Sequence, residues 1–411
     1  MSDVQDVGKG FTTMTNNKSA KATGRLMLYA SVGAELVHYD VDVDNAALIR
    51  RGSVRLDASV MYVCPHASKR YLYVVTSNRG LWPNKGAPGD THQVVALRID
   101  PETGALHTHG APVALRNRSL HITTDARSEH VLIACNEPSE LIVHRINGDG
   151  TVGDEVKQSA LDTGIYAHQV RVSPSNDAAI LVTRGNDAHG AKAEDPGALK
   201  VFSFRNGRLG DGVSIAPGNG YGFGPRHLDF HPSQPWVYVS LERQHKICLF
   251  TLNGSTLSSL PLFSVDTLSD TKNIRPRQMA GTVHVHPNGR FLYGCERADA
   301  TTEVDGRQVF AGGENSISVY AIDQVSGELV PVQHINTRGF HARTFSFDPG
   351  GRILVAACKS PVVVQEGNAT RTVSASLDVF RMGVDGRLEY IRKYDIDVGN
   401  ASLYWSGLLQ L

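Results

Sequence analysis

The sequence predicts an all-β chain folded as a seven-bladed β-propeller, and three observations lead to this prediction. Short apolar strands and polar turns recur with a period of about 50 to 60 residues, and strand-only repeats of that length are typical of four-stranded propeller blades. Seven copies of one hairpin can be found along the chain. No amphipathic helix pattern of useful length competes with the strands. We therefore expect a ring of sheets, which also limits the number of exposed sheet edges.

The first hairpin of each repeat is a short apolar strand, a turn and a second strand that begins near a charge. Clear copies have their turns at 63–70, 230–237, 285–290 and 347–352. Weaker copies have turns at 124–130 and 173–179. The flanking runs are rich in β-branched and aromatic residues, as strands are. These hairpins predict the two inner strands of six blades.

The second hairpin of each repeat is an alternating strand, a polar turn and a further Leu or Val. Its copies lie at 94–106, 141–152, 199–209, 247–257, 317–329 and 377–388, and residues 36–39 begin a seventh. The copy at 36–39 has no inner strand before it, whereas the strand at 401–405 has no partner. We therefore expect the C-terminal strand to join the first blade and close the ring.

Residues 25–411 are expected to form this single propeller domain, preceded by a disordered leader at 1–24. The leader is polar, carries Asp3 and Asp6, and contains no apolar core of the kind that a signal peptide needs.

The composition favours a neutral protein of a reducing compartment. Lysine and arginine number 41, as do aspartate and glutamate, so no overall charge attracts nucleic acid or an anionic membrane surface. The five cysteines lie apart in apolar runs without a CxxC pair, which is typical of buried free thiols. No apolar run approaches the length of a membrane-spanning helix, about 18 residues. We therefore expect a cytoplasmic protein in which any anion-binding site is local.

The links between second and third strands should gather at one face of the ring. We expect a short link in the fifth blade and long links elsewhere, with long examples at 78–92, 185–197, 298–313 and 360–374. In an up-and-down blade these links share a face with the start of each first strand. Long loops would then surround one mouth of the central channel, and loops on a rigid scaffold often carry function.

Charged residues from separate blades should meet at that mouth. Arg226 begins one strand and Glu242 follows its antiparallel partner, so the two should be neighbours although sixteen positions separate them. Strand starts supply His168, Arg226, His227, His284, His341 and Arg343, and the ends of second strands supply Arg79, Glu137, Arg184, Glu242, Arg297 and Lys359. The planar fork of arginine suits a carboxylate or a phosphate. The pattern predicts an anionic small-molecule substrate, with Glu242 or His168 as general base or acid.

Structural roles compete with these functional ones. An arginine at the start of a strand can simply clamp a loop, and His227 and His284 can be core histidines bonded to the backbone. His284 and His286 share one face of a strand, but a single HxH pair without a third ligand is a weak metal signal. We therefore predict no metal and no cofactor. The predicted substrate-binding residues are Arg184, His227, His284, Arg343 and Lys359.

The segment 224–232, Gly-Pro-Arg-His-Leu-Asp-Phe-His-Pro, followed by Glu242, resembles the seven-bladed β-propeller lactonase family. That family includes the propeller type of 6-phosphogluconolactonase and the fungal 3-carboxy-cis,cis-muconate lactonizing enzyme. Supporting segments at 167–174, 245–250, 283–297 and 343–348 extend the resemblance over most of the chain from residue 25 onward. The Gly-Pro-Arg-His segment is the specific part, because turns of the Pro-x-Gly-Arg-x-Leu-Tyr type occur in many propellers.

The resemblance implies a site made of one His, two Arg and one Glu. The matching positions are His168, Arg226, Arg297 and Glu242. The chain departs from the family pattern in its long links and in His341-Ala342-Arg343, which replaces a more usual Pro-Arg-Gly. Both departures lie at the predicted mouth, so they bear on the identity of the substrate.

Four functions are compared on these observations. In a metal-free lactone hydrolase, Glu242 or His168 would activate a water while Arg226 and Arg297 hold the anionic group and stabilise the oxyanion. In a cycloisomerase, the substrate's own carboxylate would add across a double bond next to the same arginines. A non-catalytic binding platform would instead need apolar or aromatic patches on the rim. A metal-dependent sugar lactonase has the least support, because its carboxylate and Asn ligands are not evident. We predict the lactone hydrolase.

Overall fold

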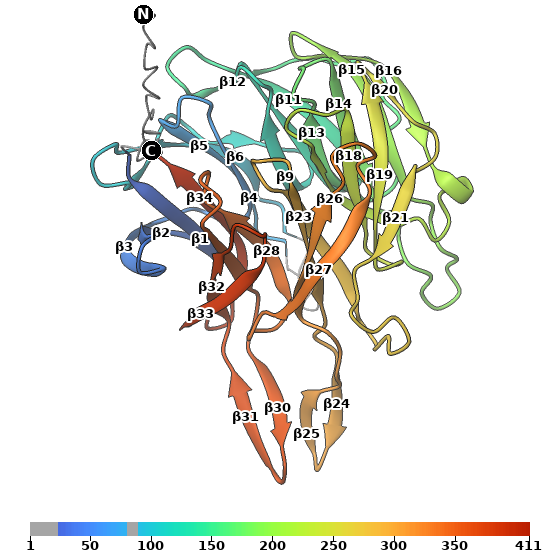
Figure 1. The fold of residues 1–411 in the computed structure, drawn as a ribbon. Coiled ribbons are helices and arrows are strands. Elements are labelled where there is room, and N and C mark those ends of the chain that lie inside the picture. Colours follow the sequence, from blue (N-terminus) through green and yellow to red (C-terminus); the bar gives the residue numbers. More distant parts are fainter. Residues whose placement is uncertain (1–23, 80–88) are drawn as a thin grey trace, which may run out of the picture.

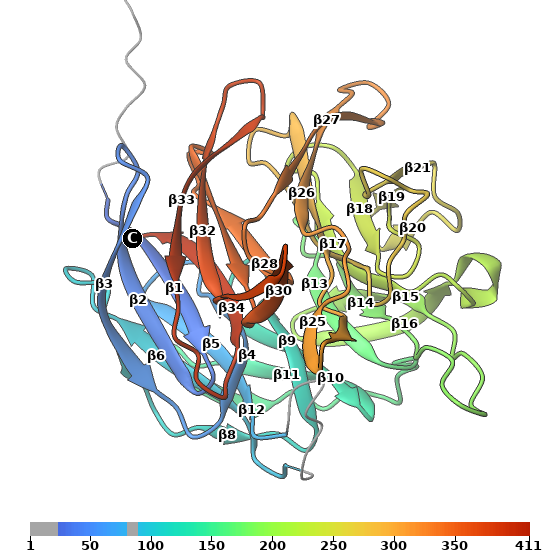
Figure 2. The same cartoon turned by 90° about the horizontal axis from the view of Figure 1, so that it is seen from below.

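The computed structural model describes residues 24–79 and 89–411, in which antiparallel sheets follow one another around a ring as seven blades (Figures 1 and 2). The predicted leader lies outside the described residues except for Gly24. One short 3-10 turn, η1 (Pro217–Gly220), is the only helical element in the part of the chain that is described. The predicted all-β propeller is confirmed.

Each blade is an antiparallel meander that runs outward from the centre of the ring. The innermost strands are β4 (Ser59–Pro65), β9 (Arg118–Thr124), β13 (Ala167–Val172), β17 (Pro225–Phe230), β22 (Met279–Val285), β28 (Ala342–Phe347) and β34 (Leu403–Gln410). The second strands are β1 (Leu26–Val32), β5 (Tyr71–Ser77), β10 (His130–Glu137), β14 (Ala178–Thr183), β18 (Trp236–Leu241), β23 (Phe291–Arg297) and β29 (Ile353–Cys358).

The outer half of each blade consists of a third strand and one or two outermost strands, which continue the antiparallel meander. The third strands are β2 (Glu35–Asp42), β6 (His92–Ile99), β11 (Ser139–Ile146), β15 (Ala198–Arg205), β19 (Lys246–Asn253), β26 (Ser316–Ile322) and β32 (Ser376–Met382). The outermost strands are β3 (Ala47–Arg55), β7 (Leu106–Thr108), β8 (Val113–Ala114), β12 (Val152–Glu155), β16 (Arg208–Ile215), β20 (Thr256–Leu257), β21 (Phe263–Asp266), β27 (Leu329–Asn336) and β33 (Leu388–Asp395).

The C-terminal strand closes the ring, as predicted. β34 pairs with β1, so the first blade has the order β3-β2-β1-β34 and combines the two ends of the described chain. The innermost strands contact one another in sequence around the channel, and β34 completes the circle by contacting both β28 and β4. The position of each inner strand therefore depends on both neighbouring blades.

The core lies between neighbouring blades, which explains the continuous apolar runs of the second strands. In β14, Ile180 and Val182 pack toward the fifth blade, whereas Leu181 packs toward the third. Successive strand residues point to opposite faces, and both faces are covered here, so residues 178–182 are all apolar. Burying one such side chain contributes about 1.5–3 kcal/mol. The inner strands are thus mounted on a rigid frame.

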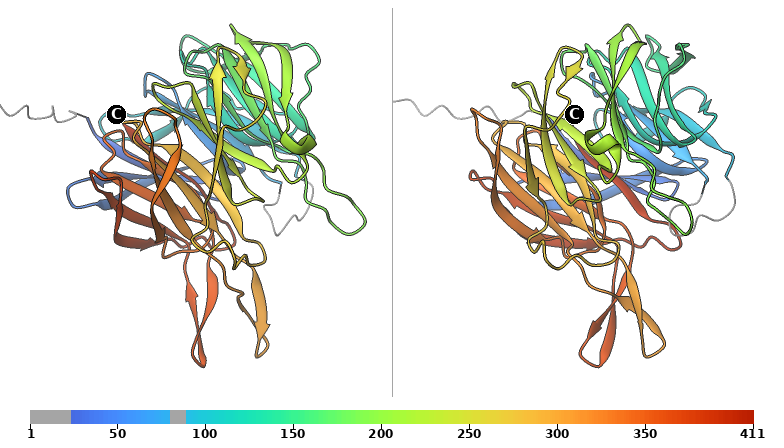
Figure 3. Two further views of the ribbon diagram at one scale, coloured as in Figure 1. Left: turned by 45° about the vertical axis from the view of Figure 1, so that its right-hand side comes forward. Right: turned by 90° about the vertical axis from the view of Figure 1, so that its right-hand side faces the viewer.

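The links at the predicted mouth differ from blade to blade. Those of the sixth and seventh blades contain hairpins, β24 (Thr301–Val304) with β25 (Arg307–Phe310) and β30 (Val362–Glu366) with β31 (Ala369–Val373). Both hairpins stand away from the ring, and β25 lies against β30 (Figures 1 and 3). The expectation of long links outside the fifth blade is wrong for the first and third blades, where only residues 33–34 and Pro138 connect the strands.

Two predictions from composition can be compared with the structure. All five cysteines are free and buried. Within the described residues, no helix is long and apolar enough to cross a membrane.

Candidate active site

A buried carboxylate at the mouth of the channel is held by three arginines from three blades. Glu242 follows β18, and its side chain is 7 % exposed. Its Oε1 accepts Arg226 Nε at 3.0 Å and also pairs with Arg297 Nη2, while its Oε2 accepts Arg184 Nε. The structure thus brings together four of the predicted site residues, including the Arg226–Glu242 pair expected from strand geometry.

The three arginines keep the Glu242 carboxylate negatively charged. Burial alone would raise the pKa of Glu242, but Arg184, Arg297 and Arg226 outweigh it and hold that pKa well below its usual range. The carboxylate is therefore ionised near neutral pH and has little tendency to take up a proton. Its geometry suits a counter-ion that positions the arginines better than it suits a general base.

A β-bulge recurs near the start of the inner strands and places several of these side chains. In β17, Pro225 pairs with Leu241 and His227 with Ser240, so Arg226 is an extra residue between them. The equivalent extra residues in β13, β28 and β34 are His168, Arg343 and Tyr404, respectively. A bulge bends the strand and redirects a side chain, and bulges are common beside active sites. In β4 and β9, the inner strands of the second and third blades, the extra residues are the apolar Met61 and Leu120. The bulge therefore occurs whether or not its extra residue is polar, and it belongs to the fold rather than to the site alone.

His168 offers the site a neutral ring nitrogen that no described residue occupies. Its side chain is buried beside Arg226, and burial together with that guanidinium holds the pKa of His168 well below its ordinary value. The imidazole is therefore neutral at pH 7, and its Nδ1 has no hydrogen-bond partner among the described residues. Tyr166 stacks near the ring, with the centroids 6.5 Å apart. A neutral imidazole can accept a proton from water.

His227 lies next to this group but deeper in the channel. Its ring centroid is 5.2 Å from that of His168 and 6.1 Å from that of His121, whose ring in turn lies 4.0 Å from that of Tyr62 at a tilt of 37°. These rings form a chain of contacts beside Arg226. His227 therefore borders the centre without joining the Glu242 ion pairs.

Arg343 and Lys359 form the other side of the mouth with Tyr404. The Arg343 Cζ lies 3.6 Å from the centroid of the Tyr404 ring, so the guanidinium stacks on the phenol. Arg343 is buried, its Nε has no hydrogen-bond partner in residues 24–79 and 89–411, and no carboxylate there pairs with it. Lys359 follows β29 and is also buried on this side. Arg118, the first residue of β9, completes the group.

The unusual His341 supports Arg297 from behind. Arg297 Nη1 lies 3.0 Å from His341 Nε2, and His341 Nδ1 lies 2.9 Å from Asp299 Oδ2. Burial lowers the pKa of His341 to about 3, although Asp299 opposes this change. The imidazole is therefore neutral, so Nε2 can accept from Arg297. Asp299 is in turn held by Arg277 at 2.8 Å.

The structure places His284 away from the predicted site, which corrects its assignment to the mouth. His284 is the sixth residue of β22, so it lies about 17 Å along the strand from Met279, the residue that begins it. Its Nδ1 is 3.4 Å from Asp229 Oδ2, while Asp229 Oδ1 accepts Arg171 Nη2 at 2.9 Å. The prediction placed His284 at the start of a strand, although β22 begins five residues earlier.

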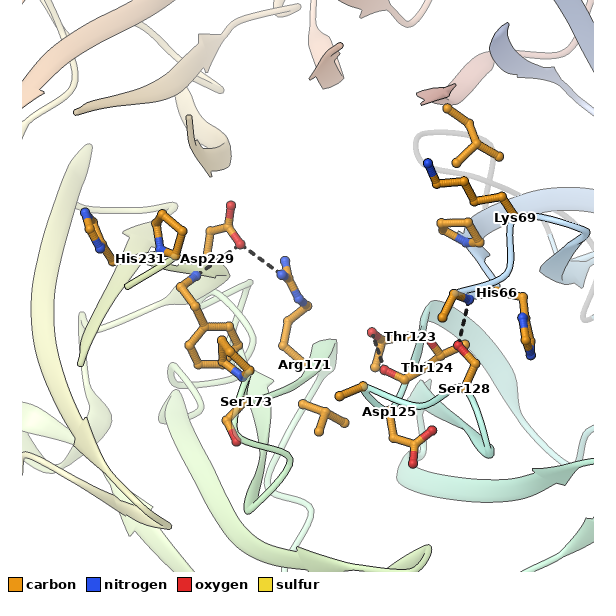
Figure 4. A pocket seen from close by; sticks show the side chains of 18 residues that line it. His66, Lys69, Thr123, Thr124, Asp125, Ser128, Arg171, Ser173, Asp229 and His231 are labelled. Carbon is orange, nitrogen blue, oxygen red and sulfur yellow. Dashed lines mark hydrogen bonds and ion pairs between the residues drawn. The ribbon is translucent and has the colours of Figure 1, made fainter. Parts of the chain in front are cut away.

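Asp229 and Arg171 line a cavity of about 470 Å³ at the opposite end of the inner strands. Figure 4 shows this pair on one side of the cavity and Lys69 on the other. The candidate site lies at the other end of the channel, beside a smaller cavity of about 300 Å³ that Tyr166, Glu137 and Asn186 border. At this rim Arg79 pairs with Glu137 at 2.8 Å.

One group among the described residues has metal-ligand chemistry, namely Asp125, Glu129 and His130. Asp125 Oδ1 already accepts the backbone N–H groups of Glu129 and His130 at 2.7 and 3.0 Å. The carboxylate therefore stabilises the turn after β9. Asp125 borders the cavity of Figure 4, away from the arginine centre.

Sequence reasoning missed two members of the site, Tyr404 and Arg118. Arg118 begins an inner strand, so the rule that selected Arg226 would have selected it as well. Tyr404 lies in the strand predicted at 401–405 to close the ring and is the second residue of the observed β34. The same rule, applied to that strand, would have placed Tyr404 at the mouth.

Comparison with known proteins gives a consistent result. The family model described as "Lactonase, 7-bladed beta-propeller" matches residues 27–366. The 6-phosphogluconolactonase of Bacillus subtilis (strain 168) is 25% identical over 341 residues, which cover 82% of this chain and 88% of that protein.

Solved structures show the same fold. A protein of Bacteroides fragilis NCTC 9343 has a TM-score of 0.68 and 18% identity, with 96% of this chain and 100% of that chain covered. The periplasmic gluconolactonase of Pseudomonas aeruginosa has a TM-score of 0.68 and 20% identity, with 90% of this chain and 96% of that chain covered.

Proposed function

Because the chain belongs to the lactonase family of seven-bladed β-propellers, we propose that the arginine-rich mouth of its channel is where it hydrolyses a small anionic lactone. The observation that carries this proposal is the charge at the site. Glu242 pairs with three guanidinium groups, of which Arg226 and Arg297 are buried and Arg184 also pairs with Asp187, and Arg343 adds a fourth without an ion-pair partner among the described residues. The excess positive charge suits a carboxylate or phosphate on the substrate.

The proposed base is His168. Its neutral imidazole takes a proton from the attacking water, a contribution typically worth about 10²–10⁴ in rate. Glu242 was an equal alternative on sequence grounds, but both of its carboxylate oxygens are occupied by arginines, whereas His168 Nδ1 has no partner among the described residues. Its proposed role is to hold those arginines in position.

The proposed oxyanion donor is Arg226. Its Nε binds Glu242, while its Nη1 has no hydrogen-bond partner among the described residues. A preorganised donor of this kind is typically worth about 10²–10³ in turnover. Arg343 and Lys359, on the other side of the mouth, are proposed to bind the anionic group of the substrate.

The substrate class is proposed to be a sugar-acid lactone that carries a phosphate or a carboxylate. The Bacillus subtilis relative is named as a 6-phosphogluconolactonase, which supports a phosphorylated sugar lactone. The cycloisomerase and binding-platform alternatives gain no support from these comparisons. We also propose that residues 25–411 act as one domain, because closure joins both ends, and that the protein is cytoplasmic, because its cysteines are free and buried.

The test is lactone hydrolysis followed by pH-stat with chelator present. The panel contains 6-phosphogluconolactone, unphosphorylated aldonolactones and carboxylated muconolactones. Wild type should hydrolyse an anionic member, and His168→Gln should lower kcat by about 10²–10⁴-fold, because glutamine cannot take up the proton. The control His107→Gln changes an exposed histidine of β7 and should leave the rate unchanged.

Two results would overturn the proposal. Full activity of His168→Gln would remove this residue from the role of base. Loss of the wild-type activity under chelator would contradict a route that uses only the side chains of this chain.

A further inference from the structure

We propose that Tyr404 is a second catalytic residue, whose phenol donates a proton to the ring oxygen of the lactone as the C–O bond breaks. This inference rests on the proposed lactone hydrolysis and assigns the acid of that reaction. Nothing in the preceding proposal protonates the leaving oxygen, which would otherwise depart as an unstable alkoxide.

The first argument is the position of Tyr404. Ser31 pairs with Trp405 and Val32 with Leu403, so Tyr404 is the extra residue of the β34 bulge. His168, Arg226 and Arg343 occupy the same position in β13, β17 and β28. The strand that closes the ring therefore offers its bulged side chain to the same site as the base and two of the arginines.

The second argument is the hydroxyl of Tyr404. Five buried tyrosines of the blade cores donate their hydroxyls to backbone carbonyls. These tyrosines are Tyr29, Tyr73, Tyr238, Tyr293 and Tyr320. Tyr404 and Tyr39 are also buried, and neither hydroxyl has such a bond to any residue that the structure describes, but only Tyr404 lies at the mouth of the channel. A buried phenol with no structural partner is free to bond a substrate.

The third argument is the charge around the ring. Arg343 of β28 stacks on the phenol at 3.6 Å. Arg118 of β9, Lys359 after β29 and Arg226 of β17 lie close enough to act on it electrostatically. The other strands that contact β34, β1 and β4, carry no charged side chain, and their ionisable groups are Tyr29, Tyr62 and Cys64. Tyr166 is a further ionisable group that interacts with Tyr404, Cys358 lies on β29, and Arg297 and Asp299 act on Lys359 beside the ring.

These cations favour the phenolate. Burial would raise the pKa of Tyr404, but Arg343, Arg118 and Lys359 outweigh it, so the pKa lies below that of an ordinary tyrosine. Burial raises the pKa of Tyr29 and Tyr73, which have no such neighbours. An acid works best when its conjugate base is stabilised in place, and the arginine stacked on Tyr404 provides that stabilisation.

The reaction is balanced with residues of this chain alone. A water oxygen bonds to the carbonyl carbon while His168 takes one of the water protons. The bond from that carbon to the ring oxygen then breaks, and the phenol proton of Tyr404 passes to the ring oxygen, which leaves as a hydroxyl. The open hydroxy acid departs, and the proton on His168 returns through solvent to the Tyr404 phenolate.

The test begins with the pH profile of wild-type hydrolysis and of Tyr404→Phe. We expect kcat to fall by about 10²–10⁴-fold with little change in KM, because the ring is kept and only the acid is lost. Wild-type kcat should fall at alkaline pH as the phenol ionises, at a pH below the ordinary tyrosine pKa of about 10. That alkaline decrease should be absent in Tyr404→Phe.

Two further measurements separate an acid from a structural residue. A thiolactone has a leaving group that needs no proton, so the penalty of Tyr404→Phe should be much smaller on it than on the oxygen lactone. Tyrosinate absorbance should show one tyrosine that ionises early in wild type and in the matched control Tyr73→Phe, but not in Tyr404→Phe. If Tyr404→Phe does not fold, Arg343→Gln should shift the same ionisation to higher pH.

The outcomes distinguish this inference from the proposed function. If wild type hydrolyses the lactone and Tyr404→Phe is equally fast, the acid assignment is wrong while the lactonase stands. An equal penalty on lactone and thiolactone, or the absence of an early-ionising tyrosine, would also overturn it. If no lactone is hydrolysed, the proposed function fails, and the assignment of Tyr404 as its acid fails with it.

Discussion

At the scale of single residues, Glu242 shows how the site keeps its charge. A carboxylate this deeply buried would normally become neutral, because burial disfavours the charged form. Arg184, Arg226 and Arg297 prevent this, and Glu242 in turn keeps three guanidinium groups together that would otherwise repel each other. The carboxylate and the arginines therefore depend on one another for their positions.

Replacement of Glu242 by glutamine should be costly for stability. The shape is kept, but the buried arginines lose their counter-charge, and removing one partner of a buried ion pair typically costs about 3–5 kcal/mol. Urea unfolding at pH 7 measures this change. Glu35→Gln is the matched control, because Glu35 and Arg55 form a surface pair 3.4 Å apart, of a kind worth about 0–1 kcal/mol. Equal effects of the two substitutions would contradict the role given to Glu242.

The pH dependence follows from the same carboxylate. The pKa of Glu242 is lower in the folded protein than in the unfolded chain, so the stability it contributes is complete above the unfolded value, about 4.3, and is lost as pH falls toward the folded value. Wild type should therefore lose stability below about pH 4.3 more steeply than Glu242→Gln. Unfolding midpoints across this range measure the difference.

At the scale of elements, a repeated bond joins neighbouring blades. Tyr238 on β18 donates its hydroxyl to the carbonyl of Gly327 in the next blade at 2.8 Å. The glycine has φ +77°, and a Cβ there would lie 2.8 Å from the ring of Trp236. The same tyrosine-to-glycine bond recurs between other blades, from Tyr29, Tyr73 and Tyr293. The tyrosine of one repeat and the turn glycine of the next are thus parts of one interface.

This bond gives a prediction about the frame of the site. Tyr238→Phe should lower the free energy of unfolding by about 1–3 kcal/mol, because it leaves a buried carbonyl without its donor. Denaturant unfolding measures the change, and hydrolysis should persist because Tyr238 lies in a blade core. Tyr221→Phe, at a position that is 59 % exposed, serves as the control. An effect no larger than that of the control would mean that water replaces the lost donor.

The elements also show what the sequence can and cannot predict. Period-two alternation and recurring turns predict the hairpins, and antiparallel pairing alone predicts that Arg226 meets Glu242. A bulge shifts the register by one residue without a residue type that marks it, because its extra position holds Leu120 in one blade and Arg343 in another. The sequence pattern therefore could not predict which residue of an inner strand is the extra residue of the bulge and points into the site. His284 was misplaced because the extent of its strand was not resolved from the pattern.

At the scale of the whole molecule, catalysis and closure depend on the same strand. β34 supplies Tyr404 to the site and also pairs with β1, so that the ring has no gap between β28 and β4. Removal of residues 403–411 should therefore do more than remove an acid. It should expose the edge of β1, and unpaired edges promote aggregation. Light scattering and loss of a cooperative unfolding transition would measure this effect.

A circular permutant separates closure from chain order. Gln410 pairs with Leu26, so a short linker can join the C-terminal end of β34 to the start of β1. New termini can be placed after Val384, which is 96 % exposed in the outer turn between β32 and β33. Such exposed turns usually tolerate new termini, so the permutant should fold cooperatively and keep its lactone hydrolysis, unlike the chain truncated at 402. If the truncated chain unfolded as cooperatively as the permutant, the stability of the ring would not depend on its closure by β34.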